Sequence, residues 1–275
     1  MIKLHLEQIQ KLELDIALEI GKFCRKNGLR YYLCGGTLLG AVRHHGFIPW
    51  DDDIDLCMPR PDYEIFIRTF QCVDRKYQLQ SSLNDDFFAP YAKVFNLHTL
   101  IKSKYSHSKR DQYIWVDILP VDGLPEDLNS VVKIYKRCDF FRKALRVSEA
   151  NLGEGKTAFR KWAKYLLQPA AVFYGKKNLV EELDKIGRSH RYEDSNYVGI
   201  VTWGLYGAGE RMLKSEFENA VEVKFEGYLF PAFSCWDSYL HGLYGDYMQL
   251  PPIEKRQTHD MEAYLLEDEE NEKEA

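Results

Sequence analysis

Aspartate is concentrated at residues 51–55, where the chain runs Asp-Asp-Asp-Ile-Asp directly after Trp50. Polar and apolar residues alternate from Asp53 to about Met58, which predicts a strand, and side chains two residues apart on a strand project to the same face. We therefore expect Asp53 and Asp55 to point the same way, close enough to share a cation. Two carboxylates held this close repel one another unless a positive charge lies between them, and hard oxygen ligands select Mg²⁺ or Mn²⁺ over zinc.

A run of aspartates can also be a solvated acidic turn without function. Here an apolar strand follows the run and a Gly-Gly turn precedes it, which favours a metal site. The run is not an EF-hand calcium loop, because it lacks that loop's glycine and its final glutamate.

A glycine pair precedes the aspartates. Gly35, Gly36 and Thr37 lie between a short apolar strand at 29–34 and a predicted helix at 38–45. Exposed N–H groups at a helix start suit a phosphate, and the Thr37 hydroxyl could cap the helix or contact a phosphate oxygen. Taken alone, a glycine pair indicates only a turn. The glycine patterns of Rossmann and P-loop nucleotide sites are absent.

Asp117 is the third candidate carboxylate. It lies within the otherwise apolar segment Trp115-Val116-Asp117-Ile118-Leu119, where a lone aspartate is costly to bury unless it is paired or binds a metal. It could complete a site for one or two Mg²⁺ ions, or accept the proton of an attacking hydroxyl. Equally, it could cap a turn or pair with an arginine. Asp122 lies in a predicted loop at 120–125, where turn chemistry would account for it.

The elements that must position these residues are strands and helices without a regular alternation. This mixture favours an α+β fold, a small mixed sheet flanked by helices, over a doubly wound sheet. We expect a single domain over residues 1–266, with a helical subdomain at about 127–190 and a disordered acidic tail at 267–275. The predicted strands are 29–34, 53–58, 91–96, 99–105, 113–119 and 197–203, with a hairpin at 221–225 and 228–230. The predicted helices are 5–26, 38–45, 61–72, 128–150, 157–174, 176–190 and 236–244.

The composition is that of a globular protein, since 45% of its 275 residues are hydrophobic, 29% are charged and 14% are aromatic. Residues 267–275 contain six acids and one lysine, which accounts for the whole net charge of −5. The rest of the chain is neutral, which argues against a nucleic-acid partner. Neither a signal peptide nor a transmembrane helix is predicted. The six cysteines form no Cys-x-x-Cys pair, so we expect reduced thiols in a cytoplasmic protein.

The segment GGTLLGAVRHHGFIPWDDDIDLCMPR, residues 35–60, resembles the signature block of the LicD family. This family contains bacterial phosphocholine transferases and is distantly related to fukutin and the fukutin-related protein. The resemblance spans about residues 28–260, although the middle helices match only in character. It continues at Ala92-Lys93-Val94, at Trp115 to Pro120, at Leu243 to Tyr247, at Pro251-Pro252 and at Arg256 to His259.

The resemblance implies a nucleotidyltransferase-type fold with residues in specified roles. Asp53 and Asp55 match the paired metal ligands, and Asp117 matches the third acid. The remaining positions are implied to bind the substrate or nucleotide, with Arg43 pairing with a diphosphate, Lys93 contacting a phosphate, and Arg256 and His259 in no assigned role. These positions are Gly35, Gly36, Thr37, Arg43, Trp50, Asp51, Lys93, Arg256 and His259.

The resemblance also implies an activity. A phospho-alcohol, phosphocholine above all, would pass from a CDP-linked donor to a hydroxyl of a cell-surface glycan such as teichoic acid, lipopolysaccharide or capsule. CMP would be released, and Mg²⁺ or Mn²⁺ would be the cofactor. Because the acceptors are often built on lipid carriers, peripheral contact with the inner face of the membrane is also implied.

Two other functions remain open on the sequence. A nucleotidyltransferase that adds a nucleotide to a small molecule would use the same three carboxylates and would release pyrophosphate instead of CMP. A binding module that kept the fold and lost activity is disfavoured, because all three carboxylates are present.

Overall fold

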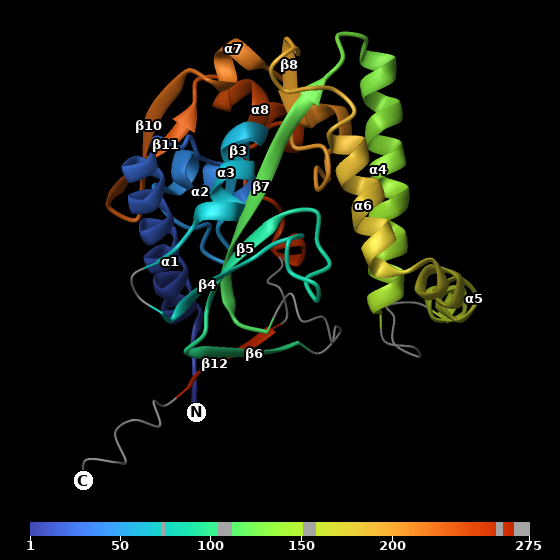
Figure 1. The fold of residues 1–275 in the computed structure, drawn as a ribbon. Coiled ribbons are helices and arrows are strands. Elements are labelled where there is room, and N and C mark those ends of the chain that lie inside the picture. Colours follow the sequence, from blue (N-terminus) through green and yellow to red (C-terminus); the bar gives the residue numbers. More distant parts are fainter. Residues whose placement is uncertain (73–74, 104–111, 151–157, 257–260, 267–275) are drawn as a thin grey trace.

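A computed structural model describes residues 1–72, 75–103, 112–150, 158–256 and 261–266 (Figure 1). The predicted acidic tail at 267–275 lies outside the described residues. The described residues form one mixed sheet and two antiparallel sheets together with helices, so the predicted α+β class is confirmed.

A mixed sheet lies at the centre of the molecule. In the described part of the chain it has seven strands, five of them in the order β2-β3-β7-β5-β4, with β8 pairing with β7 and β9 pairing with β8. Strands β3 and β7 are parallel, and the other neighbouring pairs are antiparallel. The long β7 runs through the middle (Figure 1). The strands are β2 (Tyr32–Leu33), β3 (Asp55–Pro59), β4 (Tyr77–Gln80), β5 (Ala92–Asn96), β7 (Ile114–Leu124), β8 (Tyr197–Gly199) and β9 (Met212–Leu213).

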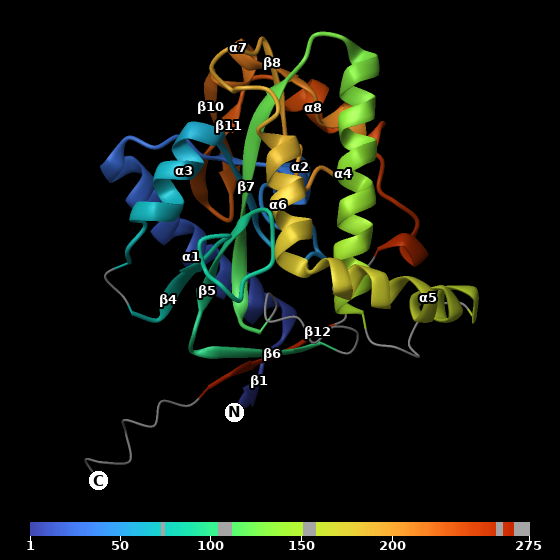
Figure 2. The same ribbon diagram turned by 45° about the vertical axis from the view of Figure 1, so that its right-hand side comes forward.

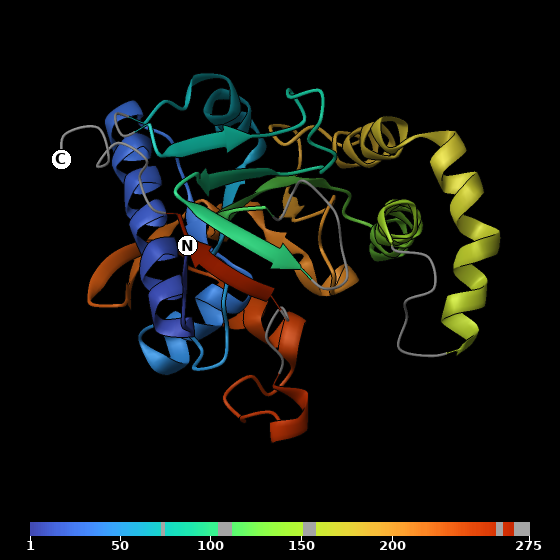
Figure 3. The same cartoon turned by 90° about the horizontal axis from the view of Figure 1, so that it is seen from below.

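Two smaller sheets complete the strands. One is a hairpin of β10 (Ala220–Phe225) and β11 (Tyr228–Phe233), and the other has the order β1-β12-β6, from β1 (Ile2–Lys3), β12 (Met261–Leu265) and β6 (Thr99–Ser103). Seen from below, the second of these lies across the lower end of the molecule (Figure 3). The hairpin turns at Glu226 and Gly227, which both have positive φ, the geometry of a tight two-residue turn.

Helices flank the central sheet on two sides. Helix α1 lies on one side, and α4 and α6 pack together on the other, while α5 extends away from the lower end of α4 (Figures 1 and 2). The helices are α1 (Leu6–Asn27), α2 (Gly35–His44), α3 (Arg60–Thr69), α4 (Leu128–Glu149), α5 (Ala158–Tyr174), α6 (Lys176–Gly187), α7 (Lys214–Phe217) and α8 (Trp236–Tyr244), with 3-10 turns η2 (Gly207–Glu210) and η3 (Ile253–Lys255).

Most predicted helices have the expected positions. Helix α1 ends where Gly28 adopts a left-handed conformation, and α8 matches the predicted 236–244. Helix α2 begins three residues earlier than predicted, at Gly35. Strand β8 is shorter than the predicted 197–203, and β2 is only two residues long. Strands β5 and β6, which were expected on either side of a short turn, belong to different sheets.

The loop predicted at 120–125 is wrong, because β7 continues through it to Leu124. Pro120 is tolerated in β7 because the hydrogen-bonded pairing with β5 ends before it. The pairing of β5 with β7 stops at Ile118, and Pro120 is aligned only with Met58 on β3. The Asp117 N–H points toward β3, and the N–H groups of a strand alternate in direction. An N–H at position 120 would therefore point to the opposite side, beyond the end of β5, so its absence in proline costs no sheet hydrogen bond.

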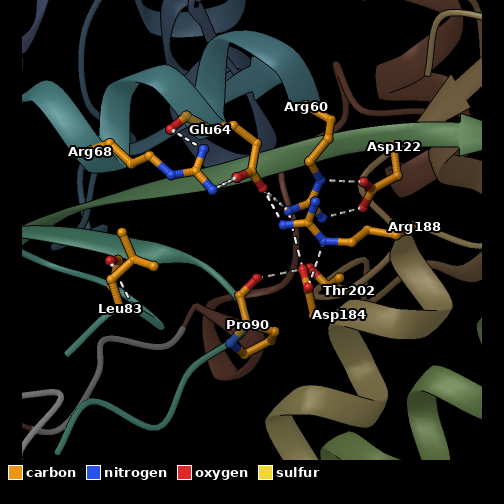
Figure 4. A network of polar contacts seen from close by, with 10 residues as sticks. Arg60, Glu64, Arg68, Leu83, Pro90, Asp122, Asp184, Arg188 and Thr202 are labelled. Carbon is orange, nitrogen blue, oxygen red and sulfur yellow. Dashed lines mark hydrogen bonds and ion pairs between the residues drawn. The ribbon is translucent and has the colours of Figure 1, made fainter. Parts of the chain in front are cut away.

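Asp122 is therefore not a turn residue. It lies on β7, is 1% exposed, and binds Arg60 through two bonds, from Nε to Oδ1 at 2.6 Å and from Nη2 to Oδ2 at 2.9 Å. Arg60 Nη1 also lies 3.2 Å from Asp184 Oδ1 on α6. Asp184 in turn accepts a bond from Arg188, which also contacts Glu64 (Figure 4). This network joins α3, β7 and α6.

Breaking the buried pair should destabilise the fold strongly. We expect Asp122→Ala to lower the free energy of unfolding by about 3–5 kcal/mol, because the buried Arg60 guanidinium would lose its two-bond partner and keep only the partly exposed Asp184 and Glu64. Urea unfolding followed by circular dichroism measures the loss. The matched control is Asp194→Ala, whose exposed carboxylate lies 3.5 Å from Arg191, and which should cost less than about 1 kcal/mol. Equal losses for the two variants would contradict the expectation.

Candidate active site

The register of the central strands brings three charged side chains together. Asp55 on β3 is aligned with Asp117 on β7, and Asp117 is aligned with Lys93 on β5. Aligned residues on neighbouring strands project from the same face of a sheet. Lys93 is 2% exposed, and its Nζ lies 3.3 Å from Asp117 Oδ1 and 3.7 Å from the centre of the Trp115 ring. The site therefore contains a buried ion pair directly beside Asp55.

Asp53 reaches the same place from a loop. Strand β3 begins at Asp55, two residues later than predicted. Asp53 and Asp55 nevertheless line the same two cavities. Ile54, between them, is fully buried, and its carbonyl accepts a hydrogen bond of 3.0 Å from the Asp117 N–H. This bond fixes the loop to β7, so both aspartates are held at the edge where Asp117 lies.

Two glycines allow α2 to begin against these carboxylates. Gly35 has φ +54°, and a Cβ placed on it would lie 3.0 Å from Asp55 Oδ2. A Cβ on Gly36 would lie 2.9 Å from Asp51 Oδ2. Side chains at either position would occupy the space beside the carboxylates. The positive end of α2 therefore faces the acidic edge of the sheet at short range.

Thr37 positions Asp55. Its side chain is buried, and Oγ1 accepts a hydrogen bond of 2.8 Å from the Asp55 N–H. The cap residue of α2 is Cys34, and no side chain caps the helix, so the expectation that Thr37 caps it is wrong. The hydroxyl instead holds the first residue of β3 to the first turn of α2.

Two cavities meet at the aspartates. The first encloses about 370 Å³ and the second about 490 Å³. Asp117, Lys93 and Gly35 line the first cavity only. Both cavities are lined by Gly36, Asp53, Asp55, Tyr206 and Tyr244. A substrate with phosphates at the shared carboxylates could thus extend in two directions.

The second cavity contains further predicted residues. Arg43, Trp50 and Asp51 line it. Arg43 Nη1 donates to the Tyr247 carbonyl at 2.6 Å, and the Arg256 guanidinium lies 4.6 Å from the centre of the Trp50 ring. Burial, and then repulsion from Arg256, lower the pKa of Arg43. These residues form a cationic and aromatic wall beside the aspartates. His259 lies outside the described residues.

Two buried acids near the aspartates were not predicted from the sequence. Glu210, from the turn η2, lines the first cavity and is 3% exposed, and burial raises the pKa of its carboxyl to about 7. Glu13 on α1 is 1% exposed, and burial and then repulsion from Asp53 hold its pKa well above the usual range. Glu13 could have been found, because it stands between Ile9 and Ile16 on the apolar face of a predicted helix. The segment Gly-Ala-Gly-Glu carries no comparable signal for Glu210.

A divalent cation fits this edge of the sheet as an ion shared with a substrate. Among the residues that the structure describes, no three His, Cys, Asp or Glu side chains enclose a metal by themselves. Asp53, Asp55 and Asp117 do line one cavity, beside space that Gly35 and Gly36 leave open. Mg²⁺ is usually bound by one or two carboxylates, with substrate phosphates and water completing its octahedron. The donor set therefore fits Mg²⁺ that arrives with a phosphate group.

A mixed sheet with carboxylates on adjacent strands, facing a helix that begins with two glycines, is the arrangement of a transferase built on a nucleotidyltransferase domain. Residues 28–146 match the family described as "LicD/FKTN/FKRP, nucleotidyltransferase domain". The chain is also 31% identical over 274 residues to "Lipopolysaccharide cholinephosphotransferase LicD" of Haemophilus influenzae, covering 97% of this chain and 100% of that protein. The chain therefore belongs to the LicD family, and it is a LicD-type phosphotransferase.

More distant similarity is local. The chain is 66% identical over 29 residues to "Ribitol 5-phosphate transferase FKRP" of Homo sapiens, which is 10% of this chain and 6% of that protein. It is 28% identical over 146 residues to an uncharacterised protein of Rickettsia prowazekii, covering 52% of each.

A pair of glycine variants separates backbone strain from crowding at the aspartates. Gly28 and Gly35 both have positive φ, but nothing lies within 4 Å of a Cβ at Gly28. Gly28→Ala should cost about 1–2 kcal/mol of unfolding free energy from the left-handed backbone alone. We expect Gly35→Ala to cost more, because its methyl group also meets the Asp55 carboxylate. Chemical denaturation of both variants measures the difference. Equal losses of unfolding free energy would show that the Asp55 side chain moves away from the methyl group at no cost.

Proposed function

We propose that this protein transfers a phospho-alcohol, phosphocholine above all, from a CDP-activated donor to a hydroxyl of a cell-surface glycan, with release of CMP. The observation that carries this proposal is the full-length similarity to a protein named a lipopolysaccharide cholinephosphotransferase. The alignment of Asp55 with Asp117 across β3 and β7 supports it, because phosphoryl transfer requires charge compensation at one fixed place.

In this proposal Asp53 and Asp55 would hold Mg²⁺ or Mn²⁺, and Asp117 would either be a third ligand or act as the base. The ion, when bound, would neutralise the diphosphate and stabilise the leaving CMP. The backbone at Gly35 and Gly36 would orient the phosphates through the positive end of α2. Lys93 would add a fixed positive charge at the other side of the carboxylates, since it lies beside Asp117.

The protein's own groups also move the proton. The acceptor hydroxyl oxygen would attack the phosphorus that carries the alcohol, and the bond from that phosphorus to the CMP oxygen would break. As the base, Asp117 would take the proton of the hydroxyl, and the Lys93 ammonium, 3.3 Å away, would hold its carboxylate in position. Thr37 would act indirectly, by holding the Asp55 backbone in place.

The second cavity would receive the CMP half of the donor. Trp50 offers a ring face, and Arg43 and Arg256 bring positive charge to the same wall. Asp51 would complete this wall beside the metal ligands. The predicted contribution of His259 stays a prediction.

The rival reaction uses the same site with a different bond broken. A nucleotidyltransferase would pass a nucleotide to a small molecule and release pyrophosphate, and the domain description is compatible with it. The full-length relative favours phospho-alcohol transfer, because its name specifies that reaction. An inactive module of the same fold would release neither product.

The test is CMP release from CDP-choline with Mg²⁺, with and without a glycan acceptor. We expect metal-dependent release that Asp55→Asn reduces by about 10²–10³-fold, because a neutral amide cannot hold the metal ion that neutralises the phosphates. Asp194→Asn, an exposed position, is the matched control and should keep full activity. If CMP is released only from CDP-glycerol, CDP-ribitol or CDP-ethanolamine, the reaction would stand with that compound as the donor in place of CDP-choline. Pyrophosphate formed from a nucleoside triphosphate would support the rival.

We propose that the protein meets its glycan acceptor at a membrane surface. No described helix is long and apolar enough to span a bilayer. Helix α5 nevertheless exposes large apolar side chains, with Leu167 58% and Phe173 94% exposed, and Phe140 on α4 is 67% exposed. The exposed Lys143 lines the same apolar cavity as Phe140 and Leu167. An apolar helix face with a neighbouring cation is suited to lie in the headgroup region of an anionic bilayer, at the inner face of the membrane.

Vesicle binding tests this surface. The double variant Leu167→Ser with Phe173→Ser should reduce co-sedimentation with phosphatidylglycerol vesicles at least about 10-fold, because two apolar anchors are lost. The control is Leu229→Ser, since Leu229 is also 58% exposed but lies on β11, in the separate hairpin. Unchanged sedimentation of the double variant would show that α5 has another role.

A further inference from the structure

Aromatic rings surround the inner part of the first cavity. They come from distant parts of the chain, and none of them was predicted to bind a ligand. The lining rings are Tyr91, Trp115, Trp203, Tyr206, Tyr239 and Tyr244. The Tyr206 and Tyr244 rings lie 5.0 Å apart at 74°, and the Tyr91 and Trp203 rings lie 4.9 Å apart at 55°. Rings at steep angles to each other form adjoining walls rather than a stack.

Glu210 lies among these rings with its charge uncompensated by any described ion pair. Its Oε1 accepts a bond of 3.4 Å from the Tyr206 N–H, and its carboxyl is also hydrogen-bonded by the Tyr239 side chain and the Leu205 backbone. Within the described residues, Oε2 is buried without a hydrogen-bond donor. A buried carboxylate in this state is costly, and a cation of the ligand would remove the cost.

The other charges near the cavity are accounted for elsewhere. Lys93 faces Asp117. Arg146 on α4 also lines this cavity but is exposed, and its guanidinium lies 5.3 Å from the centre of the Trp203 ring. Arg142 is buried and attracts Glu210 through space, and its guanidinium contacts the Thr202 carbonyl at 3.5 Å and Asp139 at 3.9 Å. A cationic ligand group can therefore meet Glu210 without displacing an existing partner.

A single side chain, that of Tyr239, connects Glu210 to the proposed phosphate site. Tyr239 links the two, because its hydroxyl accepts a 3.3 Å bond from the Gly35 N–H and its side chain bonds Glu210. Gly35 in turn lies directly beside Asp55. A phosphate at Asp55 and a cationic group at Glu210 would thus be separated by about one side chain, which suits a small alcohol with a positive end.

We propose that Glu210, Tyr206 and Tyr244 form the subsite for the head group of the transferred alcohol, and that this head group is a quaternary ammonium. This inference rests on the proposed function. A quaternary ammonium has no N–H to donate, so it binds through ring faces and a nearby carboxylate, which is what these walls provide. The head group would fill the first cavity while the nucleotide occupies the second.

Donor selectivity tests the subsite. We expect Glu210→Gln to lower the ratio of kcat/KM for CDP-choline to kcat/KM for CDP-glycerol about 10-fold, mainly through KM, because only the choline donor carries the charge. Tetramethylammonium chloride should inhibit the parent protein in competition with CDP-choline, and the variant much less. Glu222→Gln, an exposed position on β10, is the matched control. Equal losses on both donors, or a preference for CDP-ethanolamine, would overturn the proposal.

A binding measurement separates this proposal from the proposed function. Choline chloride titrated into the parent protein in a calorimeter should give heat that Glu210→Gln abolishes, whether or not the protein turns over any donor. If no CDP-alcohol is consumed and choline still binds, the proposed reaction fails and the subsite stands. If Glu210→Gln does not fold, Tyr206→Leu replaces it, since Tyr206 is 46% exposed and its loss removes one ring wall. Undiminished choline binding by that variant would count against the subsite.

Discussion

The parallel pairing of β3 with β7 is the constraint on which the site depends. Side chains alternate between the faces of a strand, so a slip of one residue would move Asp117 to the opposite face from Asp55. The fold fixes the register from both sides. Thr37 binds the Asp55 backbone from α2, and the Ile54 carbonyl binds the Asp117 backbone. Further along, Pro59 is aligned with Val121, and the Arg60–Asp122 pair follows immediately, so the same ladder is closed by a buried ion pair at its other end.

Charge at the site is distributed so that each acid has a different surrounding. Asp117 has an ammonium beside it, whereas Glu210 has tyrosines and a backbone N–H. Asp53 and Asp55 lie at the junction of two cavities, next to a helix start that carries no side-chain bulk. Burial raises the pKa of Glu210 to about 7, which allows one cavity to offer acids with separate roles.

The sequence was sufficient where local patterns determine structure. The apolar spacing and the glycine stop predict α1, and the acidic segment and glycine pair predict residues that the fold does bring together. It was insufficient where distant segments meet. Strand β4 and strand β12 have no strong pattern of their own and exist through their partners β5 and β6. Pro120 suggested a loop because the end of the β5 ladder, which makes a proline acceptable, is a property of the sheet. Glu210 is in the site because α8 brings Tyr239 to it, and no local spacing records that contact.

The described residues pack into two hydrophobic cores, and the first cavity is lined mostly by side chains of the first. One core includes the central sheet with α1, and the other is formed chiefly by α4 and α6. Trp203 packs against both cores and also lines the cavity. Because Arg60 at the start of α3 contacts Asp184 on α6, ion pairs as well as apolar packing hold the helices of the second core beside the sheet that carries the site.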